Sequence, residues 1–152
     1  MQGPVPDDQY FMSEALAEAR KGLEEGGVPI GSVLVIDGQI VGRGHNRRVQ
    51  EGSAILHGEM DAFRNAGRLP ASAYSRATLY STLSPCDMCT GATLLFKIPR
   101  VVFAENRTFV GGEDYLRARG VEVVNLDLPE AVELMNDFIA RCPHIWNEDI
   151  AV

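Results

Sequence analysis

The hydrophobic positions along the chain predict a series of helices and strands. Residues 8–24 carry apolar side chains at four-residue spacing and stop at a glycine pair: Phe11, Ala15, Ala19 and Leu23, then Gly26 and Gly27. This spacing predicts an amphipathic helix that ends at the glycines. Residues 32–43, SVLVIDGQIVGR, form two β-rich runs around Asp37-Gly38. An Asp-Gly pair between such runs is typical of a tight β-hairpin.

The rest of the chain continues this alternation. We expect a helix over 56–66, closed by Gly67, and β-rich runs follow at residues 77–82, 100–104 and 121–126. Further helical patterns lie at residues 85–97, 113–119 and 130–141. The order αββαβαβαβα predicts strands that helices cover on both faces, as in a three-layer α/β/α sandwich.

Composition narrows the class of protein. The 152 residues contain no repeat or linker, so we expect one domain over 1–152. Hydrophobic residues make up 45% of the chain, and no apolar run reaches the roughly 18 residues of a membrane span. The opening MQGPVPDDQY lacks the pattern of a signal peptide, which favours a cytoplasmic protein. The net charge of −7, with no basic block longer than Arg47-Arg48, argues against a nucleic-acid partner.

The segment STLSPCDMCTGA, residues 81–92, holds two of the three cysteines of the chain. Ser84 is a typical N-cap and Pro85 a typical first helical residue, so Cys86 is expected in a first helical turn, with Cys89 one turn later on the same face. The positive end of the helix dipole favours thiolates. A CxxC at a helix start is equally typical of a redox pair, so this motif alone leaves metal binding and redox chemistry open.

The histidines decide between these alternatives. His57 stands two residues before Glu59 at the start of a predicted helix, whereas His45 is expected to make a structural hydrogen bond and His144 to lie at the surface. One histidine and two cysteines supply three zinc ligands and leave a fourth position open, which marks a catalytic rather than a structural zinc. An acidic side chain beside such a site can shuttle protons. A redox pair would leave His57 and Glu59 without a role.

The combination of HGE at 57–59 with PCDMC at 85–89 matches the pattern of zinc-dependent nucleobase deaminases. It resembles the signature of the cytidine deaminase superfamily. Five segments extend the resemblance to the fungal-type cytosine deaminases, which act on the free base: GGVPIG at 26–31, GRGHN at 42–46, LHGEMDAF at 56–63, TLSPCDMCTGA at 82–92 and WNEDI at 146–150.

The resemblance implies a cytidine deaminase-like fold with a central five-stranded mixed sheet between helices. It implies one Zn²⁺ per chain, held by His57, Cys86 and Cys89, and Glu59 as the catalytic proton shuttle. The reaction it implies is hydrolysis of cytosine to uracil and ammonia.

The resemblance also implies a substrate pocket for a small free base. Asn46 would bond the pyrimidine carbonyl with the Gly58 N–H as second donor, and a tail that closes over the site would exclude a ribose or a polynucleotide. The other implied substrate-binding residues are Ile30, Ser84, Phe109, Trp146 and Asp149. A homodimer is implied as well, and the strongly apolar predicted helix TGATLLFKI favours a contact between subunits.

Three other functions compete with cytosine deamination. The nearest is a deaminase of another small ring, such as isocytosine, guanine, a creatinine-like compound or an s-triazine. A tRNA adenosine deaminase would share the zinc motifs, and a non-enzymatic CxxC redox or zinc module forms the third class. Outside the motifs, we expect Cys142 to be a buried filler and Glu113-Asp114 to form a solvated first helical turn.

Overall fold

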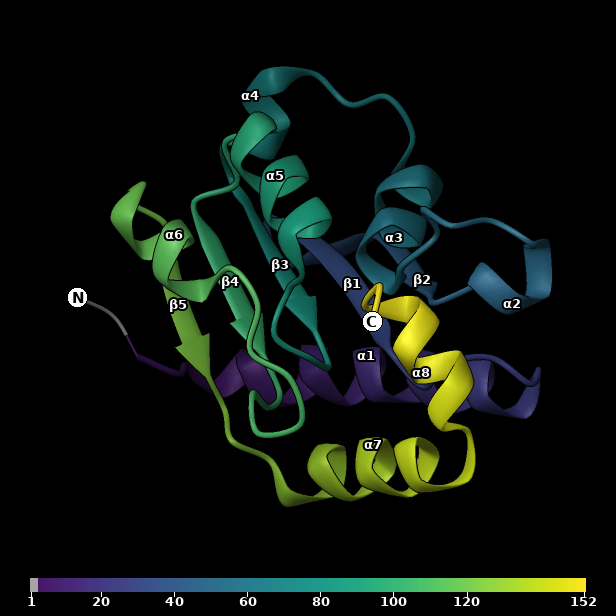
Figure 1. Ribbon diagram of the computed structural model, residues 1–152. Helices are drawn as coiled ribbons and strands as arrows, with labels where there is room; N and C mark the ends of the chain where they lie inside the picture. Colours follow the sequence, from purple (N-terminus) through teal and green to yellow (C-terminus); the bar gives the residue numbers. More distant parts are fainter. Residues whose placement is uncertain (1–2) are drawn as a thin grey trace.

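The computed structural model describes residues 3–152 and is built on a five-stranded sheet with the order β2-β1-β3-β4-β5. The strands are β1 (Gly31–Ile36), β2 (Gln39–His45), β3 (Ala77–Ser81), β4 (Arg100–Phe103) and β5 (Glu122–Asn125). β1 runs antiparallel to both of its neighbours, while β3, β4 and β5 are parallel to one another. The sheet is therefore mixed, as the resemblance implied (Figure 1).

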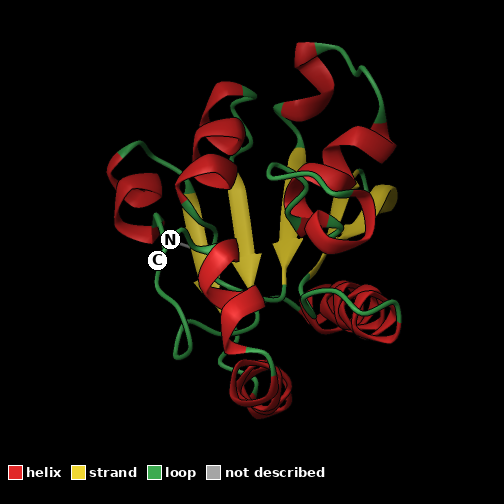
Figure 2. Ribbon diagram, turned by 45° about the vertical axis from the view of Figure 1, so that its right-hand side comes forward, coloured by secondary structure: helices red, strands yellow, loops and turns green. Residues whose placement is uncertain are grey.

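Helices cover both faces of this sheet (Figures 1 and 2). One face packs against α1 (Pro6–Glu24) and α7 (Pro129–Arg141), which share an apolar cluster with it. The other face packs against α3 (Gly58–Ala66), α4 (Ala71–Tyr74), α5 (Asp87–Leu95) and α6 (Glu113–Ala118). The predicted three-layer α/β/α sandwich is confirmed. No helix within residues 3–152 has both the length and the apolar character to cross a bilayer.

The strands are apolar on both sides because each side faces a helical layer. On β1, Val33 and Val35 join the cluster of α1, while Leu34 and Ile36 join the cluster of α3. Successive side chains of a strand point to opposite faces, so an uninterrupted apolar run fills both interiors.

The predicted hairpin is confirmed at the turn between β1 and β2. Asp37 and Gly38 both have positive φ, 51° and 76°. This conformation is the one that a two-residue type I′ turn requires, and it suits Asp-Gly. The predicted end of the first helix is also confirmed, since Gly26 follows α1 with a φ of 91°.

The direction of the strands brings the predicted site residues to one edge of the sheet. β2 and β3 both run opposite to β1, so the carboxyl ends of β2, β3, β4 and β5 lie together. Asn46 follows β2 and Ser84 lies just beyond β3. Ligand sites of α/β proteins lie at such carboxyl edges.

Three short helices were not predicted: α2 (Arg48–Glu51), α4 and α8 (Pro143–Asp149). Helices of four to seven residues are too short to show a hydrophobic period. The predicted start of the cysteine helix is wrong as well. Cys86, not Ser84, is the N-cap residue of α5, which begins at Asp87 rather than at Pro85.

Candidate active site

Three metal-binding side chains meet at the start of two helices. His57 is the N-cap residue of α3 and Cys86 the N-cap residue of α5, and Cys89 lies one turn into α5. The ligand atoms of all three lie within 4.8 Å of one another. The His57 Nδ1 atom is 3.3 Å from Cys86 Sγ and 3.9 Å from Cys89 Sγ. The predicted convergence of the two sulfurs and one imidazole is confirmed.

This donor set fits zinc. With Zn–N near 2.0 Å and Zn–S near 2.3 Å, tetrahedral ligands are about 3.5–3.8 Å apart. The two nitrogen–sulfur distances bracket that range. Thiolate and imidazole are ligands that zinc prefers, and three of them leave one tetrahedral position for water or substrate. The three cysteines of the chain are all free thiols, so no disulfide competes for the sulfurs.

The charges at this cluster favour a thiolate. The Cys89 thiol, by hydrogen bonding to Cys86, lowers the pKa of Cys86 to about 4, and His57 contributes to the shift. Burial alone would lower the pKa of His57, but the neighbouring Cys86, Asp149 and Glu59 raise it to about 9. The α5 N-terminus, with its unpaired N–H groups, adds positive potential at Cys86.

Glu59 lies beside this cluster in the first turn of α3 and is only 3% exposed. Burial raises the pKa of Glu59 to about 7, and the negative charge of Cys86 adds to the effect. A carboxyl group with a pKa near neutrality can both take up and release protons at physiological pH.

A small cavity of about 20 Å³ adjoins the cluster, with room for roughly one water molecule. Eight predicted site residues line it: Ile30, His57, Glu59, Ser84, Cys86, Phe109, Trp146 and Asp149. Sequence reasoning missed two further lining residues, Leu83 and Ile150. The other predicted residues do not line the cavity but contact residues that do: Cys89 contacts His57, Asn46 contacts Asp149 and Gly58 contacts Ile30.

Asn46 does not line the cavity but contacts Asp149, which does. Its Nδ2 donates a hydrogen bond of 2.8 Å to Asp149 Oδ1, across 103 positions of sequence. Its backbone N–H donates to the carbonyl of Ile30 at 2.9 Å. A Cβ atom at Gly58 would lie 3.0 Å from the same Ile30 oxygen, so a glycine lets the start of α3 approach this strand end.

Two aromatic rings form one wall of the cavity. Phe109 comes from the loop after β4 and Trp146 from α8, and their ring centroids are 6.0 Å apart at an interplanar angle of 87°. The buried carboxylate of Glu105 holds the start of this loop by accepting hydrogen bonds from the backbone N–H groups of Arg107 and Thr108. The predicted closure of the tail over the site agrees with the position of α8, drawn in yellow in Figure 1.

Glycines at 111 and 112 press the end of this loop onto the metal-binding segment. The Gly112 N–H donates to the Pro85 carbonyl at 2.8 Å, and the Gly111 N–H donates to Ser84 Oγ at 2.9 Å. A Cβ atom at Gly111 would lie 1.8 Å from the Pro85 oxygen. The loop that carries Phe109 is thus in direct contact with the residue before Cys86.

Glu113 is not solvated as predicted, and its contacts explain why Ser84 is not the predicted helix cap. It is 5% exposed rather than solvated, because its Oε2 accepts a hydrogen bond of 2.8 Å from Ser84 Oγ and its Oε1 accepts one from Asn106. The Ser84 hydroxyl is therefore engaged with Glu113 and Gly111 instead of capping α5. Asp114 is fully exposed, as predicted.

His45 makes the structural hydrogen bonds that were expected of it. The ring is completely buried, with Nδ1 2.9 Å from Glu18 Oε1 and Nε2 2.8 Å from Glu25 Oε1. These bonds tie the end of β2 to α1 just before Asn46. His144 is exposed, as predicted, whereas Cys142 is only partly buried, at the edge of an apolar cluster that includes Phe138 and Trp146.

Comparisons with known proteins place the chain in a family. Residues 5–105 match the family described as the cytidine and deoxycytidylate deaminase zinc-binding region. The chain is 53% identical over 145 residues to a cytosine deaminase of Candida albicans, covering 95% of this chain and 97% of the relative. It is 43% identical over 113 residues to a tRNA-specific adenosine deaminase of Streptococcus pyogenes, covering 74% and 71%.

A solved structure of a guanine deaminase from Nitrosomonas europaea is similar in fold. It has a TM-score of 0.72 and 23% identity, and the match covers 90% of this chain and 85% of that one. The sequence match, the shared fold and the three converging zinc ligands together show that the chain belongs to the zinc-binding cytidine and deoxycytidylate deaminase family.

Proposed function

We propose that this protein is a hydrolase that converts free cytosine and water to uracil and ammonia. The observation that carries the proposal is the grouping of His57, Cys86 and Cys89 beside a small cavity that Glu59 lines. The 53% identity to the Candida albicans cytosine deaminase extends over nearly all of both chains and supports cytosine as the substrate.

In this proposal, His57, Cys86 and Cys89 would hold the zinc ion. The ion would supply Lewis acidity, which lowers the pKa of water to roughly 7. Glu59 would accept one proton from the attacking water and pass it to ring nitrogen N3 while the water oxygen adds to C4. Glu59 would then take the second proton from the hydroxyl on C4 and pass it to the amino nitrogen, so that the bond between C4 and that nitrogen breaks, ammonia leaves and the C4 carbonyl of uracil forms.

Asn46 and Asp149 would recognise one edge of the base. The side-chain amide of Asn46 has two N–H donors, and one of them is bonded to Asp149, so the second can donate to the carbonyl at C2. Asp149 accepts hydrogen bonds only, so it suits the adjacent N1–H of a free base. A nucleoside carries its sugar on N1 and lacks this donor, which favours a free base over a nucleoside or a polynucleotide.

The aromatic wall of Phe109 and Trp146 would stack against the ring. Because the cavity holds roughly one water molecule, α8 or the Phe109 loop must move before a base can bind. Closure around the base then excludes bulk water, which strengthens the polar contacts inside.

A substrate panel with two variants tests the function. Ammonia release is measured with cytosine, isocytosine, guanine, cytidine and a tRNA anticodon stem-loop, alongside bound zinc. We expect turnover of cytosine, and we expect Glu59→Gln to retain zinc while losing about 10³-fold in kcat. Glu133→Gln, at an exposed position of α7, serves as the control. Turnover of guanine or the stem-loop in place of cytosine would instead support the other candidate functions, and release of no ammonia from any compound would contradict the enzyme assignment.

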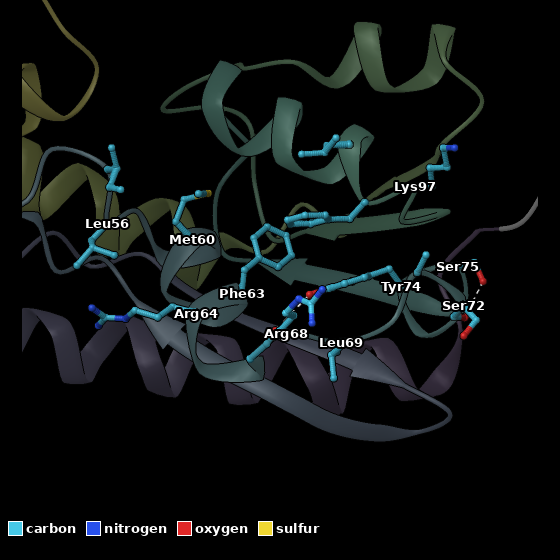
Figure 3. Close-up of a pocket in the computed structure, with 15 residues that line it drawn as sticks. Leu56, Met60, Phe63, Arg64, Arg68, Leu69, Ser72, Tyr74, Ser75 and Lys97 are labelled. Atoms are coloured by element: carbon cyan, nitrogen blue, oxygen red, sulfur yellow. Dashed lines mark hydrogen bonds between the residues drawn. The ribbon is translucent and has the colours of Figure 1, made fainter.

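We propose that the protein pairs with a second copy of itself through the α3–α5 surface. An open groove of about 970 Å³ runs between these helices and α4, and Figure 3 shows Leu56, Met60 and Phe63 following one another along it. Leu95 stands 74% exposed at the same groove. In a two-fold symmetric contact, the protruding side chain of each copy can insert into the apolar groove of the other.

Light scattering tests this pairing. We expect a dimer for the unmodified chain and a monomer for Leu95→Asp. Tyr115→Ser, which removes a 55% exposed ring from α6, should leave the dimer intact. A monomeric unmodified chain would contradict the pairing.

We also propose a cytoplasmic location. The zinc site needs Cys86 and Cys89 as thiolates, and a reducing compartment keeps such thiols from pairing with each other. Cell fractionation followed by immunoblotting checks this, and recovery of the protein in a secreted fraction would contradict it.

A further inference from the structure

Arg48 stands where the two side chains proposed to recognise the base meet. It is the first residue of α2, and its backbone N–H donates to Asn46 Oδ1 at 3.1 Å. Its guanidinium Nη1 lies 3.6 Å from Asp149 Oδ1, the same oxygen that accepts the hydrogen bond from Asn46 Nδ2. Arg48, Asn46 and Asp149 therefore form a closed ring of three contacts.

The fold fixes the Arg48 side chain in this position. Its Nε donates to the carbonyl of Ala54 at 3.0 Å, which binds the guanidinium to the loop after α2. The side chain is only 19% exposed. It lines a hollow of about 330 Å³ between this loop and α8, together with Ile145 and Glu148. A guanidinium held at two points loses less freedom when it pairs with a carboxylate than one on an open surface.

Asp149 needs a partner of this kind. Its side chain is 2% exposed, and a buried carboxylate is unfavourable unless a cation or hydrogen-bond donors offset its charge. In the part of the chain that the structure describes, the cationic side chains within 4.0 Å of Asp149 are Arg48 and His57. A histidine that binds zinc is a neutral imidazole. Arg48 is then the cation that faces Asp149.

We propose that Arg48 is a positioning residue for base recognition. Its main chain sets the orientation of the Asn46 amide, and its guanidinium holds Asp149 on the lid helix α8, so that a donor and an acceptor face one edge of the ligand. The ligand class is a heterocycle with a carbonyl next to a ring N–H. The inference rests on the proposed function, and it adds a role for a residue that does not itself line the cavity.

Binding of uracil, the product, tests this without any chemical step. Calorimetry on the zinc-loaded full chain compares Arg48→Gln, Asp149→Asn and the double variant. If Arg48 acts through Asp149, Arg48→Gln weakens uracil binding by about tenfold in the native background and by less than about twofold in the Asp149→Asn background. In turnover, the same variant raises KM by a similar factor with little change in kcat.

Two further variants separate positioning from loss of structure. Arg48→Lys keeps the positive charge and should recover most of the affinity. Arg141→Gln removes an exposed arginine that pairs with Asp137 on α7, and should bind uracil normally. Equal losses from Arg48→Gln in both backgrounds, or no loss at all in a variant that melts at the wild-type temperature, would overturn the inference. If the unmodified chain deaminates cytosine, such a result refutes only the role of Arg48, whereas a chain that neither binds uracil nor deaminates cytosine refutes the proposed function and this inference with it.

Discussion

Replacement of Gly111 by alanine tests whether the Phe109 loop must press against the metal-binding segment. The new Cβ would lie 1.8 Å from the Pro85 carbonyl oxygen, where real Cβ contacts stay above 3.0 Å, so the loop must retreat by at least 1.2 Å. The φ of Gly111 is not in the left-handed region, so alanine brings no backbone strain of its own. The retreat also lengthens the hydrogen bonds from Gly111 to Ser84 and from Gly112 to Pro85.

Such a displacement moves the aromatic wall relative to the zinc ligand next to Pro85. A misplacement of about 1 Å in a site can cost roughly 10²-fold in rate, while the overpacking itself costs about 1–3 kcal/mol of stability. We therefore expect kcat/KM for cytosine to fall about 100-fold, measured by ammonia release and accompanied by a thermal melt. Gly91→Ala on α5, where nothing lies within 4 Å of the new Cβ, is the matched control and should be as active as the native chain. If Gly111→Ala keeps its full kcat/KM at a native melting temperature, the contact has no role in aligning the site.

Three further predictions concern stability, the metal and the lid. Asp8 is fully buried against Arg100, and although burial alone would raise its pKa, the hydrogen bonds from Arg100, Tyr80 and the Val5 N–H lower that pKa below 3.8. A depressed carboxyl pKa stabilises the fold at pH values above the pKa of the unfolded chain, so Asp8→Asn should lower the free energy of unfolding by about 3 kcal/mol in urea melts at pH 7. The difference between the variant and the native chain should shrink as the pH falls below 3.8. A difference that does not depend on pH would contradict the pairing. Chelation should lower the melting temperature and abolish ammonia release, with both restored by Zn²⁺, and indifference to chelators would argue against a bound metal. Deletion of residues 146–152 should reduce kcat/KM by at least about 100-fold while zinc stays bound, and an active truncated chain would contradict the lid.

The metal site could be predicted because its ligands occur in two short sequence motifs. His57 and Glu59 are two positions apart and Cys86 and Cys89 are three, and thiol and imidazole side chains are rare enough that their spacing is informative. The alternation of apolar runs was equally sufficient for the layers, since both faces of the sheet are buried.

The groups proposed to recognise the base could not be derived in this way. The contact from Asn46 to Asp149 spans 103 positions, and no periodic pattern links residues so far apart, so only the resemblance to known deaminases pointed to it. The start of α5 was misplaced for a related reason. The Ser84 hydroxyl bonds to Glu113, 29 positions away, and this distant partner overrides the local preference of serine for a helix cap. For α8, Pro143 at its first position was the signal that could have revealed the helix.

The family match ends at residue 105, whereas Phe109, Trp146 and Asp149 all lie beyond it. Three of the residues proposed to contact the base are thus encoded apart from the zinc ligands and Glu59, while Asn46 and Ile30 lie within the match. We therefore expect mutations in the last third to change the substrate preference while the zinc ligands and Glu59 keep their positions. A chimera that keeps residues 1–105 and takes the remainder from a relative should accordingly shift the substrate preference from one amino-substituted ring to another.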